Sequence, residues 1–366
     1  MSVQRRIPAV YMRGGTSRCL VFHARDLPAA GADRDAILLE ALGSPDPYGR
    51  QLDGLGGGIS SLSKACIIGP STHPDAQVDY TFAQVEVKVP VVDYKGNCGN
   101  CSSSVGPFAI DEKLVPVRDG VTAVRIHNTN TKKIIVAHVP VQDGEAMVAG
   151  DFELAGVPGL GARIALDFLD PGGAGTGRLL PTGMVREDID GIEASLVDAT
   201  NAMVFVRAKD LGLTGTEAPT AIDADPTLTA RLERIRVQAG ERMGLTGSAA
   251  VPKIALIAPP ASFTGLDGVT YGPDAADVLG RVMSMGNCHR AFALTAAMCL
   301  AVAARIDGTV VHEAVANSHG DVRLAHPSGV LPIAAGVTTK RGAPFAEKVT
   351  VYRTARRLME GFVRVP

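Results

Sequence analysis

The chain has 366 residues, of which 20% are charged and 4% aromatic, and its formal net charge is −2. This length allows two domains with sizeable cores. The near-neutral charge and the absence of tryptophan exclude nucleic acid and an anionic membrane surface as expected partners. No segment is apolar enough to span a bilayer and the N-terminus lacks a signal core, so a cytoplasmic location is expected. Six cysteines without a disulfide framework agree with a reducing compartment.

The first recognisable unit is a strand, a glycine turn and a second strand over residues 8–22. Glycine lets the backbone of such a turn approach a ligand closely, and hydroxyl and guanidinium groups can bind a carboxylate there. Gly15, Thr16, Ser17 and Arg18 are therefore candidate substrate-binding residues. An ordinary hairpin with no ligand explains the same pattern.

A short helix is expected over residues 33–42, followed by a glycine-rich run at 53–58. The run resembles a phosphate loop, but the spacing of a P-loop is absent. Ser63 and Lys64 come next and open an apolar strand at 65–68. Burial beside such a strand would lower the pKa of an ammonium group and make it a base. The alternative is a solvated lysine at a strand edge.

The rest of the chain is arranged around residues 96–110, where a Gly/Asn turn runs into a helix-like apolar segment. Cys98 falls at the expected start of the helix, where free backbone N–H groups form an anion site and lower the pKa of a thiol. Gly99, Asn100 and Ser102 would supply donors there. Cys98 and Cys101 also have the spacing of a redox pair or of half a zinc site, and Cys101 could be a buried structural thiol.

The second half of the chain repeats signals of the first. Residues 96–98 recur at 286–288, before an apolar helix expected over 290–305, and the turn at 127–130 is echoed at 326–329. The offsets are similar, 288 − 98 = 190 and 326 − 127 = 199. This predicts two similar lobes with helix starts facing one cleft. The Gly/Pro-rich segment ending at residue 183 would divide them into 1–183 and 184–366, with the last strand able to pack back on the first lobe.

These residues together resemble the PrpF family of isomerases, which acts on 2-methylaconitate and whose relatives include 3-methylitaconate isomerase and 4-oxalomesaconate tautomerase. The resemblance covers nearly the whole chain. The motifs that carry it are Met12-Arg13-Gly14-Gly15-Thr16-Ser17, Ser61-Leu62-Ser63-Lys64, Gly96-Asn97-Cys98-Gly99-Asn100, Val105-Gly106-Pro107-Phe108-Ala109-Ile110, Leu180-Pro181-Thr182-Gly183, Asp198 with Asn201, Gly286 with His289, and His326-Pro327-Ser328-Gly329.

The resemblance implies an α+β fold like that of diaminopimelate epimerase, in which each of two pseudo-symmetric lobes is a sheet wrapped around a central helix. It places the catalytic pair on Lys64 and Cys98. Two departures from the family pattern stand out. Arg18 occupies a position where lysine is usual, and Cys288 adds a second thiol as in the epimerases.

The function that follows is a cofactor-independent isomerase that moves an allylic proton in an unsaturated di- or tricarboxylate, with Lys64 as base and Cys98 as acid. No metal or nucleotide cofactor is expected. A homodimer is the oligomeric state that we consider. The expected activity is like that of a 2-methylaconitate cis-trans isomerase, and 3-methylitaconate, aconitate and 4-oxalomesaconate are the alternative substrates. A two-thiol epimerase that uses Cys98 and Cys288, and a non-catalytic accessory protein, are the alternatives from other classes. The second lobe would contribute the substrate-binding residues Cys288, His289, His326, Ser328 and Gly329.

Overall fold

The computed structural model describes residues 4–247, 251–284, 286–317 and 319–366. The chain forms two compact units, one of Met1–Phe168 with Tyr352–Pro366 and one of Leu169–Val351. The boundary therefore lies before the Gly/Pro-rich segment and not at residue 183, and the last strand belongs to the first unit. The reason is that this segment is tied to the second unit: Gly173 N–H donates to Asp198 O over 2.8 Å, and Asp198 N–H donates to Leu179 O over 2.9 Å.

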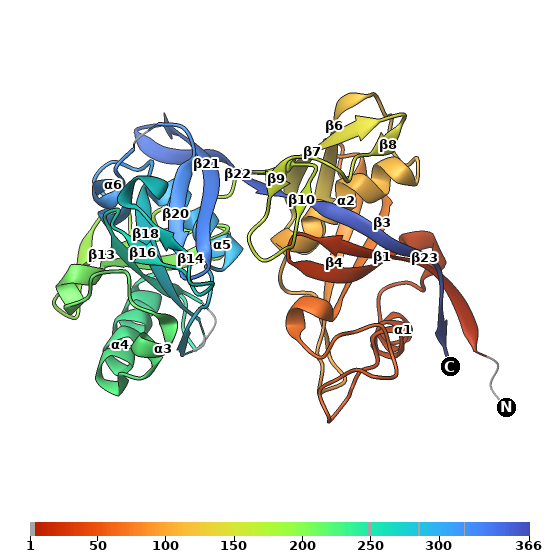
Figure 1. Cartoon of the computed structure of the whole chain (residues 1–366), viewed down its shortest axis with the longest axis horizontal. Helices are drawn as coiled ribbons and strands as arrows, with labels where there is room; N and C mark the ends of the chain where they lie inside the picture. Colours follow the sequence, from red (N-terminus) through yellow and green to blue (C-terminus); the bar gives the residue numbers. More distant parts are fainter. Residues whose placement is uncertain (1–3, 248–250, 285, 318) are drawn as a thin grey trace. The chain divides into compact units, whose positions relative to one another are not determined.

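Figure 1 shows the helices and strands along the chain, and both units contain elements of each kind. The helices are α1 (Ala32–Leu42), α2 (Gly99–Asp111), α3 (Pro219–Asp223), α4 (Pro226–Arg242), α5 (Leu294–Ala303) and α6 (Val310–Ala314). The strands are β1 (Arg5–Gly14), β2 (Ser17–His23), β3 (Lys64–Pro70), β4 (Val78–Val85), β5 (Val92–Asp93), β6 (Gly120–Asn128), β7 (Lys133–Gln142), β8 (Glu145–Ala146), β9 (Phe152–Glu153), β10 (Leu160–Gly161), β11 (Ile164–Leu169), β12 (Glu187–Ile189), β13 (Ile192–Ala199), β14 (Asn201–Arg207), β15 (Lys253–Ala258), β16 (Phe263–Thr264), β17 (Thr270–Tyr271), β18 (Val278–Ser284), β19 (Asn287–Cys288), β20 (Val322–His326), β21 (Gly329–Lys340), β22 (Ala343–Arg353) and β23 (Ala355–Val365).

In the first unit a sheet wraps around α2. Its strands pair in the order β23, β1, β2, β3, β4, β6, β7, β11, with parallel pairs at β2–β3 and β4–β6. Helix α2 packs against β1, β2, β3, β4, β6, β7 and β23, as the ribbon in Figure 1 allows the reader to follow. The opposite face of β2 and β3 packs on α1 through an apolar cluster that includes Leu20, Phe22 and Ile37.

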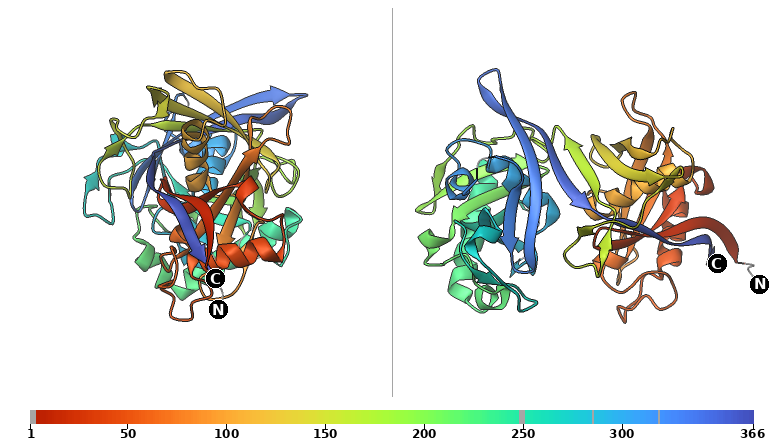
Figure 2. Two further views of the ribbon diagram at one scale, coloured as in Figure 1. Left: turned by 90° about the vertical axis from the view of Figure 1, so that its right-hand side faces the viewer. Right: turned by 45° about the horizontal axis from the view of Figure 1, so that its top comes forward.

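The second unit repeats this order of pairing. Strands β13, β14, β15, β18, β20 and β21 alternate antiparallel and parallel in the same sequence as β1, β2, β3, β4, β6 and β7. Helix α5 lies between β18 and β20 in the chain, as α2 lies between β4 and β6, and it packs on β13, β14 and β21. Helices α3 and α4 replace α1. The predicted duplication is therefore visible in the topology, and Figure 2 shows each unit from two further sides.

Most of the predicted elements are present. The helix expected at 33–42 is α1, and the one after Cys98 is α2. The helix expected from residue 290 is wrong at its start, because α5 begins at Leu294. The chain stays extended beyond Cys288, since β18 and β19 form a hairpin and His289 N–H still donates to Val282 O over 2.9 Å.

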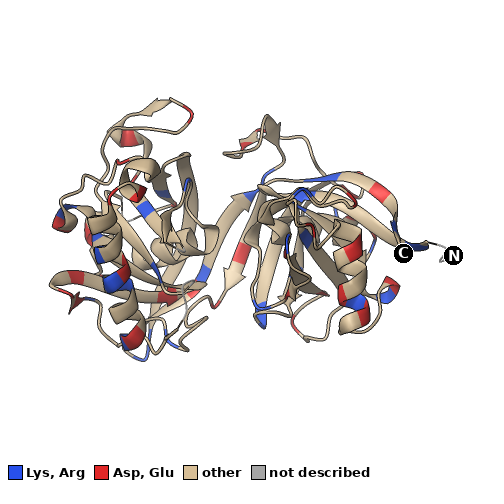
Figure 3. Ribbon diagram, turned by 90° about the horizontal axis from the view of Figure 1, so that it is seen from below, with Lys and Arg blue, Asp and Glu red and all other residues tan. Residues whose placement is uncertain are grey.

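Charged residues are spread over the surface. Blue and red segments alternate along the face of each unit that Figure 3 displays. Within the described residues, no helix combines the length and apolar character that crossing a membrane would need.

Candidate active site

Cys98 caps the N-terminus of α2. Its backbone is extended (φ −108°, ψ 103°), and its Sγ accepts the Cys101 N–H over 3.4 Å, in the place that a serine or aspartate oxygen often takes. The backbone N–H groups of Gly99 and Asn100, in the first turn, have no hydrogen-bond partner within the described part of the chain. Free donors at the positive end of a helix of this length form a site for a carboxylate or an enolate oxygen.

Lys64 begins β3 and is buried, with 7% of its surface exposed. Side chains alternate along a strand, so Lys64 shares a face with Cys66, whose thiol packs against Cys101 of α2. The opposite face, with Ala65 and Ile67, belongs to the apolar cluster on α1. The strand therefore turns Lys64 toward the helix that carries Cys98.

The strand beside β3 holds the lysine in place. Lys64 pairs with Gln84 of β4, and its Nζ donates a short hydrogen bond to Gln84 Oε1. Gln84 is fixed in turn, because its Nε2 donates to Ser63 O over 2.9 Å. The ammonium also lies 5.1 Å from the centre of the Phe82 ring, at a distance where a cation is attracted to the ring face. These contacts keep Lys64 on the α2 side of the sheet.

The surroundings of Cys98 favour its thiolate. A hydrogen bond with the Cys101 thiol lowers the pKa of Cys98 to about 6, the positive charge of Lys64 and the Cys101 backbone N–H act in the same direction, and burial opposes them. The pKa of Arg353 is lowered to about 10 by burial, while the charge of Cys98 raises it. Cys98 thus faces two cations, Lys64 and Arg353.

The predicted glycine turn lies against the start of α2. Gly15 has φ +52°, and a Cβ atom there would lie 2.3 Å from Asn100 Oδ1. The Asn100 side chain donates to Thr16 Oγ1 over 3.0 Å and accepts from Arg353 Nε over 3.1 Å. Gly15, Thr16 and Asn100 are therefore brought together beside Cys98, and their substrate-binding role stays a prediction.

Two other predicted residues, Arg18 and Ser63, are placed differently. Arg18 lies on the face of β2 opposite Cys19, with its guanidinium 5.5 Å from the centre of the Tyr11 ring, on the side that packs on α1. The Ser63 hydroxyl donates to Val85 O over 2.8 Å and is buried. Ser17 is buried, with 3% of its surface exposed, and shares a face of β2 with Cys19, whose thiol packs against Cys101 of α2. Within the described residues no hydrogen bond joins any of these side chains to Cys98 or Lys64.

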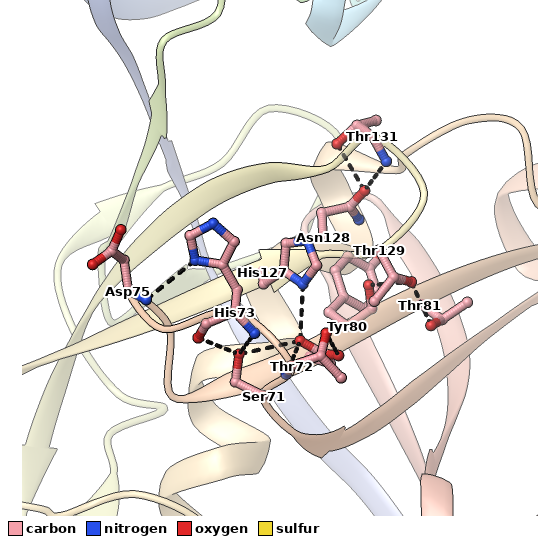
Figure 4. Close-up of polar contacts among 11 residues, drawn as sticks. Ser71, Thr72, His73, Asp75, Tyr80, Thr81, His127, Asn128, Thr129 and Thr131 are labelled. Atoms are coloured by element: carbon pink, nitrogen blue, oxygen red, sulfur yellow. Dashed lines mark hydrogen bonds and ion pairs between the residues drawn. The ribbon is translucent and has the colours of Figure 1, made fainter.

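The turn before Cys98 is anchored from β6. Asn97 Oδ1 accepts from Asn128 Nδ2 over 3.2 Å and from Ser102 Oγ over 3.3 Å. The Asn128 oxygen accepts from the Thr131 N–H over 2.8 Å, which closes the turn after β6, as Figure 4 shows. The N–H group of Ser102, predicted as a free donor, is occupied, because it donates to Cys98 O over 2.9 Å, and the Ser102 hydroxyl donates to the same oxygen over 3.0 Å. Its role is to hold the N-terminal turn of α2.

In the second unit, the predicted residues His326, Ser328 and Gly329 lie in one turn, and Ser328 is bonded to the segment that contains His289. The Ser328 hydroxyl donates to Arg290 O over 2.5 Å and its N–H donates to His326 Nδ1 over 3.1 Å. These bonds tie the turn after β20 to the segment that follows Cys288. Gly329 opens β21 with φ +126°. His289 Nδ1 accepts the Ala291 N–H over 3.0 Å.

The surroundings of Cys288 disfavour its thiolate, whereas those of Cys98 favour it. It is buried within β19 rather than at a helix start, and burial raises its pKa to about 11, with the Asp223 carboxylate adding to the effect and Arg281 opposing it. Asp223 Oδ1 accepts the Cys288 N–H over 2.7 Å. The thiol is therefore kept protonated at neutral pH.

Sequence reasoning missed three residues. Gln84 and Arg353 gave no local signal, since Arg353 reaches the site only because the C-terminal segment returns to the first unit. Lys253 begins β15 as Lys64 begins β3, and burial lowers its pKa. Lys253 could have been found from the internal repeat, because its offset from Lys64, 253 − 64 = 189, is close to the offset of 190 between Cys98 and Cys288.

Known proteins match this chain over its whole length. The family model described as PrpF protein matches residues 4–366. A 3-methylitaconate isomerase of Eubacterium barkeri is 45% identical, with 100% of this chain and 98% of the relative covered. A 2-methyl-aconitate isomerase of Shewanella oneidensis is 41% identical, with 99% and 98% covered. A 4-oxalomesaconate tautomerase of Pseudomonas putida is 40% identical, with 98% and 96% covered.

Solved structures confirm the fold class predicted from the sequence. A crystal structure of methylitaconate-delta-isomerase superposes with a TM-score of 0.91 at 45% identity, covering 100% of this chain and 96% of the other. A hydroxyproline epimerase of Agrobacterium vitis, at 14% identity and a TM-score of 0.53 with 100% and 94% covered, shares the fold.

Proposed function

Because this chain belongs to the PrpF family, we propose that it is an isomerase of an unsaturated di- or tricarboxylate and that Lys64 and Cys98 carry out its proton transfers. The observation that carries the assignment of residues is the pairing of a buried lysine and a thiol with a pKa of about 6 beside free N–H donors of α2. The names of the relatives support 2-methylaconitate-like acids as substrates.

The reaction moves a proton along an allylic system. A base removes a proton from the carbon next to the double bond, and the electron pair spreads over the double bond into a carboxylate, which forms a dienolate. A proton returned to the far carbon shifts the double bond, and one returned to the first carbon after rotation exchanges cis for trans. The dienolate oxygen needs fixed donors, and the N–H groups of Gly99 and Asn100 can supply them.

The electrostatics of the pair favour Cys98 as the base. With a pKa of about 6 the thiol is ionised at neutral pH, and the ammonium of Lys64 stabilises it. The thiolate then accepts the allylic proton and the lysine, held by Gln84, returns one. This reverses the roles expected from the sequence, in which Lys64 was the base. The acid and base must lie near one carbon, and β3 turns Lys64 toward the helix that Cys98 caps.

The substrate-binding roles in the second unit stay predictions, as does a homodimer. In a two-thiol epimerase Cys288, whose pKa is raised to about 11 by burial, would be the proton donor and Cys98 the base, so this alternative is tested by Cys288→Ala. A non-catalytic accessory protein would not explain why a thiolate and a buried ammonium are held together at an anion site.

Proton NMR in D₂O tests the proposal. The protein is mixed in turn with 2-methylaconitate, 3-methylitaconate, aconitate and 4-oxalomesaconate, and the allylic signals are followed. We expect at least one acid to lose its allylic protons and to give an isomer, and Cys98→Ala to abolish both events. A folded protein that exchanges no proton in any of these acids would refute the function.

A further inference from the structure

Cys98 and Cys101 form a dithiol at the start of α2. Cys98 is the N-cap and is partly exposed, whereas Cys101, three residues later in the first turn, is fully buried. The Cys101 N–H donates to Cys98 Sγ over 3.4 Å, which holds the first turn of α2 against the Cys98 sulfur. Cys-x-x-Cys at a helix start is the arrangement in which the first thiol is ionised and the second lies within reach of it.

Further thiols lie behind this pair. The Sγ atoms of Cys19, Cys66 and Cys101 all lie within 4.8 Å of one another, and all three residues are buried. Burial raises the pKa of Cys66 and of Cys101 well above the ordinary value, so these thiols stay protonated. The pKa of the Cys19 thiol is lowered by hydrogen bonds with Cys101 and Cys66, but Cys19 is buried, with 1% of its surface exposed. An oxidant that arrives from solvent therefore reaches the sulfur of Cys98 first, and the protonated Cys101 thiol follows it in the first turn of α2.

We propose that hydroperoxides oxidise this pair to a Cys98–Cys101 disulfide, which reversibly blocks the site. The Cys98 thiolate attacks one peroxide oxygen, so that an S–O bond forms, the O–O bond breaks and hydroxide leaves. The Cys101 sulfur then attacks the Cys98 sulfur. An S–S bond forms, the S–O bond breaks, and the leaving hydroxide takes the Cys101 proton as water. One hydrogen peroxide thus oxidises two thiols and yields two waters, and a small dithiol reverses the change.

The loss of activity rests on the proposed function, because the disulfide consumes the sulfur that would accept the allylic proton. Formation of the disulfide does not depend on that function. Cys101 protects Cys98, because it converts the sulfenic acid of Cys98, the first oxidation product, into a disulfide. Without it, a second peroxide would carry Cys98 to the sulfinic acid, which dithiols do not reduce.

The sequence makes the product easy to map. Trypsin cleaves after Lys95 and Lys113, so Cys98 and Cys101 share one peptide, while Cys19 and Cys66 lie in two others. A Cys98–Cys101 disulfide lowers the mass of the shared peptide by two hydrogens and blocks its alkylation. A disulfide from Cys101 to either neighbour would join two peptides instead. Peptide mapping without reductant therefore distinguishes the products.

The experiment treats the full chain with hydrogen peroxide, then with dithiothreitol, and follows both the peptides and isomerase activity. We expect the internal disulfide in the peptide of residues 96–113, with activity lost and then regained. Cys101→Ser should be inactivated without recovery and should show Cys98 sulfinic acid. The control Cys299→Ser removes a buried thiol of the second unit and should behave as the unchanged protein.

Three results would overturn the proposal. They are Cys98 sulfinic acid without a disulfide in the unchanged protein, a peptide joined to Cys19 or Cys66, or full recovery of peroxide-treated Cys101→Ser. Circular dichroism of each variant excludes misfolding as the cause. If the disulfide forms in a protein that isomerises none of the acids, the proposed function is refuted and the proposed oxidation of Cys98 and Cys101 is supported. If the acids are isomerised and no disulfide forms, only the proposed oxidation of Cys98 and Cys101 is refuted.

Discussion

Cys98 is a residue whose behaviour is set by its neighbours. The Cys101 thiol, Lys64 and the first turn of α2 all favour its ionised form, and they lower its pKa to about 6. If the thiolate is the base, kcat/KM should rise with pH through about 6 and then level off. An increase centred instead near the ordinary value of a free thiol, about 8.5, would contradict this.

The second residue-scale prediction concerns the thiol itself. Cys98→Ser keeps the N-cap but replaces a thiolate by a hydroxyl that stays protonated, so turnover should fall by ~10²–10⁴-fold, the usual contribution of a positioned acid or base. Steady-state rates with the most active acid measure the loss. Cys299→Ser, a buried thiol of the second unit, serves as the control and should keep its rate. Equal losses in both variants would point to damage to the fold.

Lys64→Met tests the partner of Cys98. The change removes the amine and keeps an apolar side chain of similar length in a position that is 7% exposed. We expect deuterium exchange at saturating substrate to fall by ~10²–10⁴-fold, while calorimetry still detects binding at the free N–H groups of α2. The matched control is Lys88→Met at an exposed position. Normal exchange with weak binding would make Lys64 a carboxylate anchor and not a catalytic residue.

At the scale of elements, the contact between the β1–β2 turn and α2 fixes the start of the helix. A side chain at Gly15 would need φ +52° and would lie 2.3 Å from Asn100 Oδ1. Gly15→Ala should therefore destabilise the protein by ~1–3 kcal/mol and displace Asn100 from Thr16 and Arg353.

Thermal and urea unfolding measure this loss, with Gly96→Ala as the control. Gly96 lies two residues before Cys98, and a Cβ atom there meets no other atom within 4 Å. The control should change stability by less than ~0.5 kcal/mol. A Gly15→Ala protein as stable as the control would show that the turn can move away from α2.

The sequence also shows where local patterns stop being informative. The Gly/Asn turn sufficed to predict the start of α2 and Cys98 as its cap. The same three-residue match at residues 286–288 predicted a helix start that is absent, because hairpin pairing continues past it. Arg353 could not be predicted, since its place depends on a strand that returns from the far end of the chain.

At the scale of the whole molecule, two units share one order of strand pairing, yet their thiols have diverged. The repeat made Cys288 the counterpart of Cys98, and Lys253 the counterpart of Lys64. The order of strand pairing is kept while the sequences diverge, because it depends on many residues of the hydrophobic core. Thiol ionisation depends on a few contacts: Cys98 has the helix start and Lys64, whereas Cys288 has Asp223 and burial.

Cys288→Ala measures how far that divergence has gone. If Lys64 and Cys98 carry out both proton transfers, the variant should retain most of its turnover, since the Cys288 thiol, kept protonated by a pKa raised to about 11 by burial, then takes no part in them. A modest increase in KM is compatible with the predicted role in substrate binding. The comparison is with Cys98→Ser under the same conditions. Equal and severe loss of kcat in both variants would mean that the two thiols exchange the substrate proton between them, as in a two-thiol epimerase, and that the repeat has kept its chemical as well as its structural symmetry.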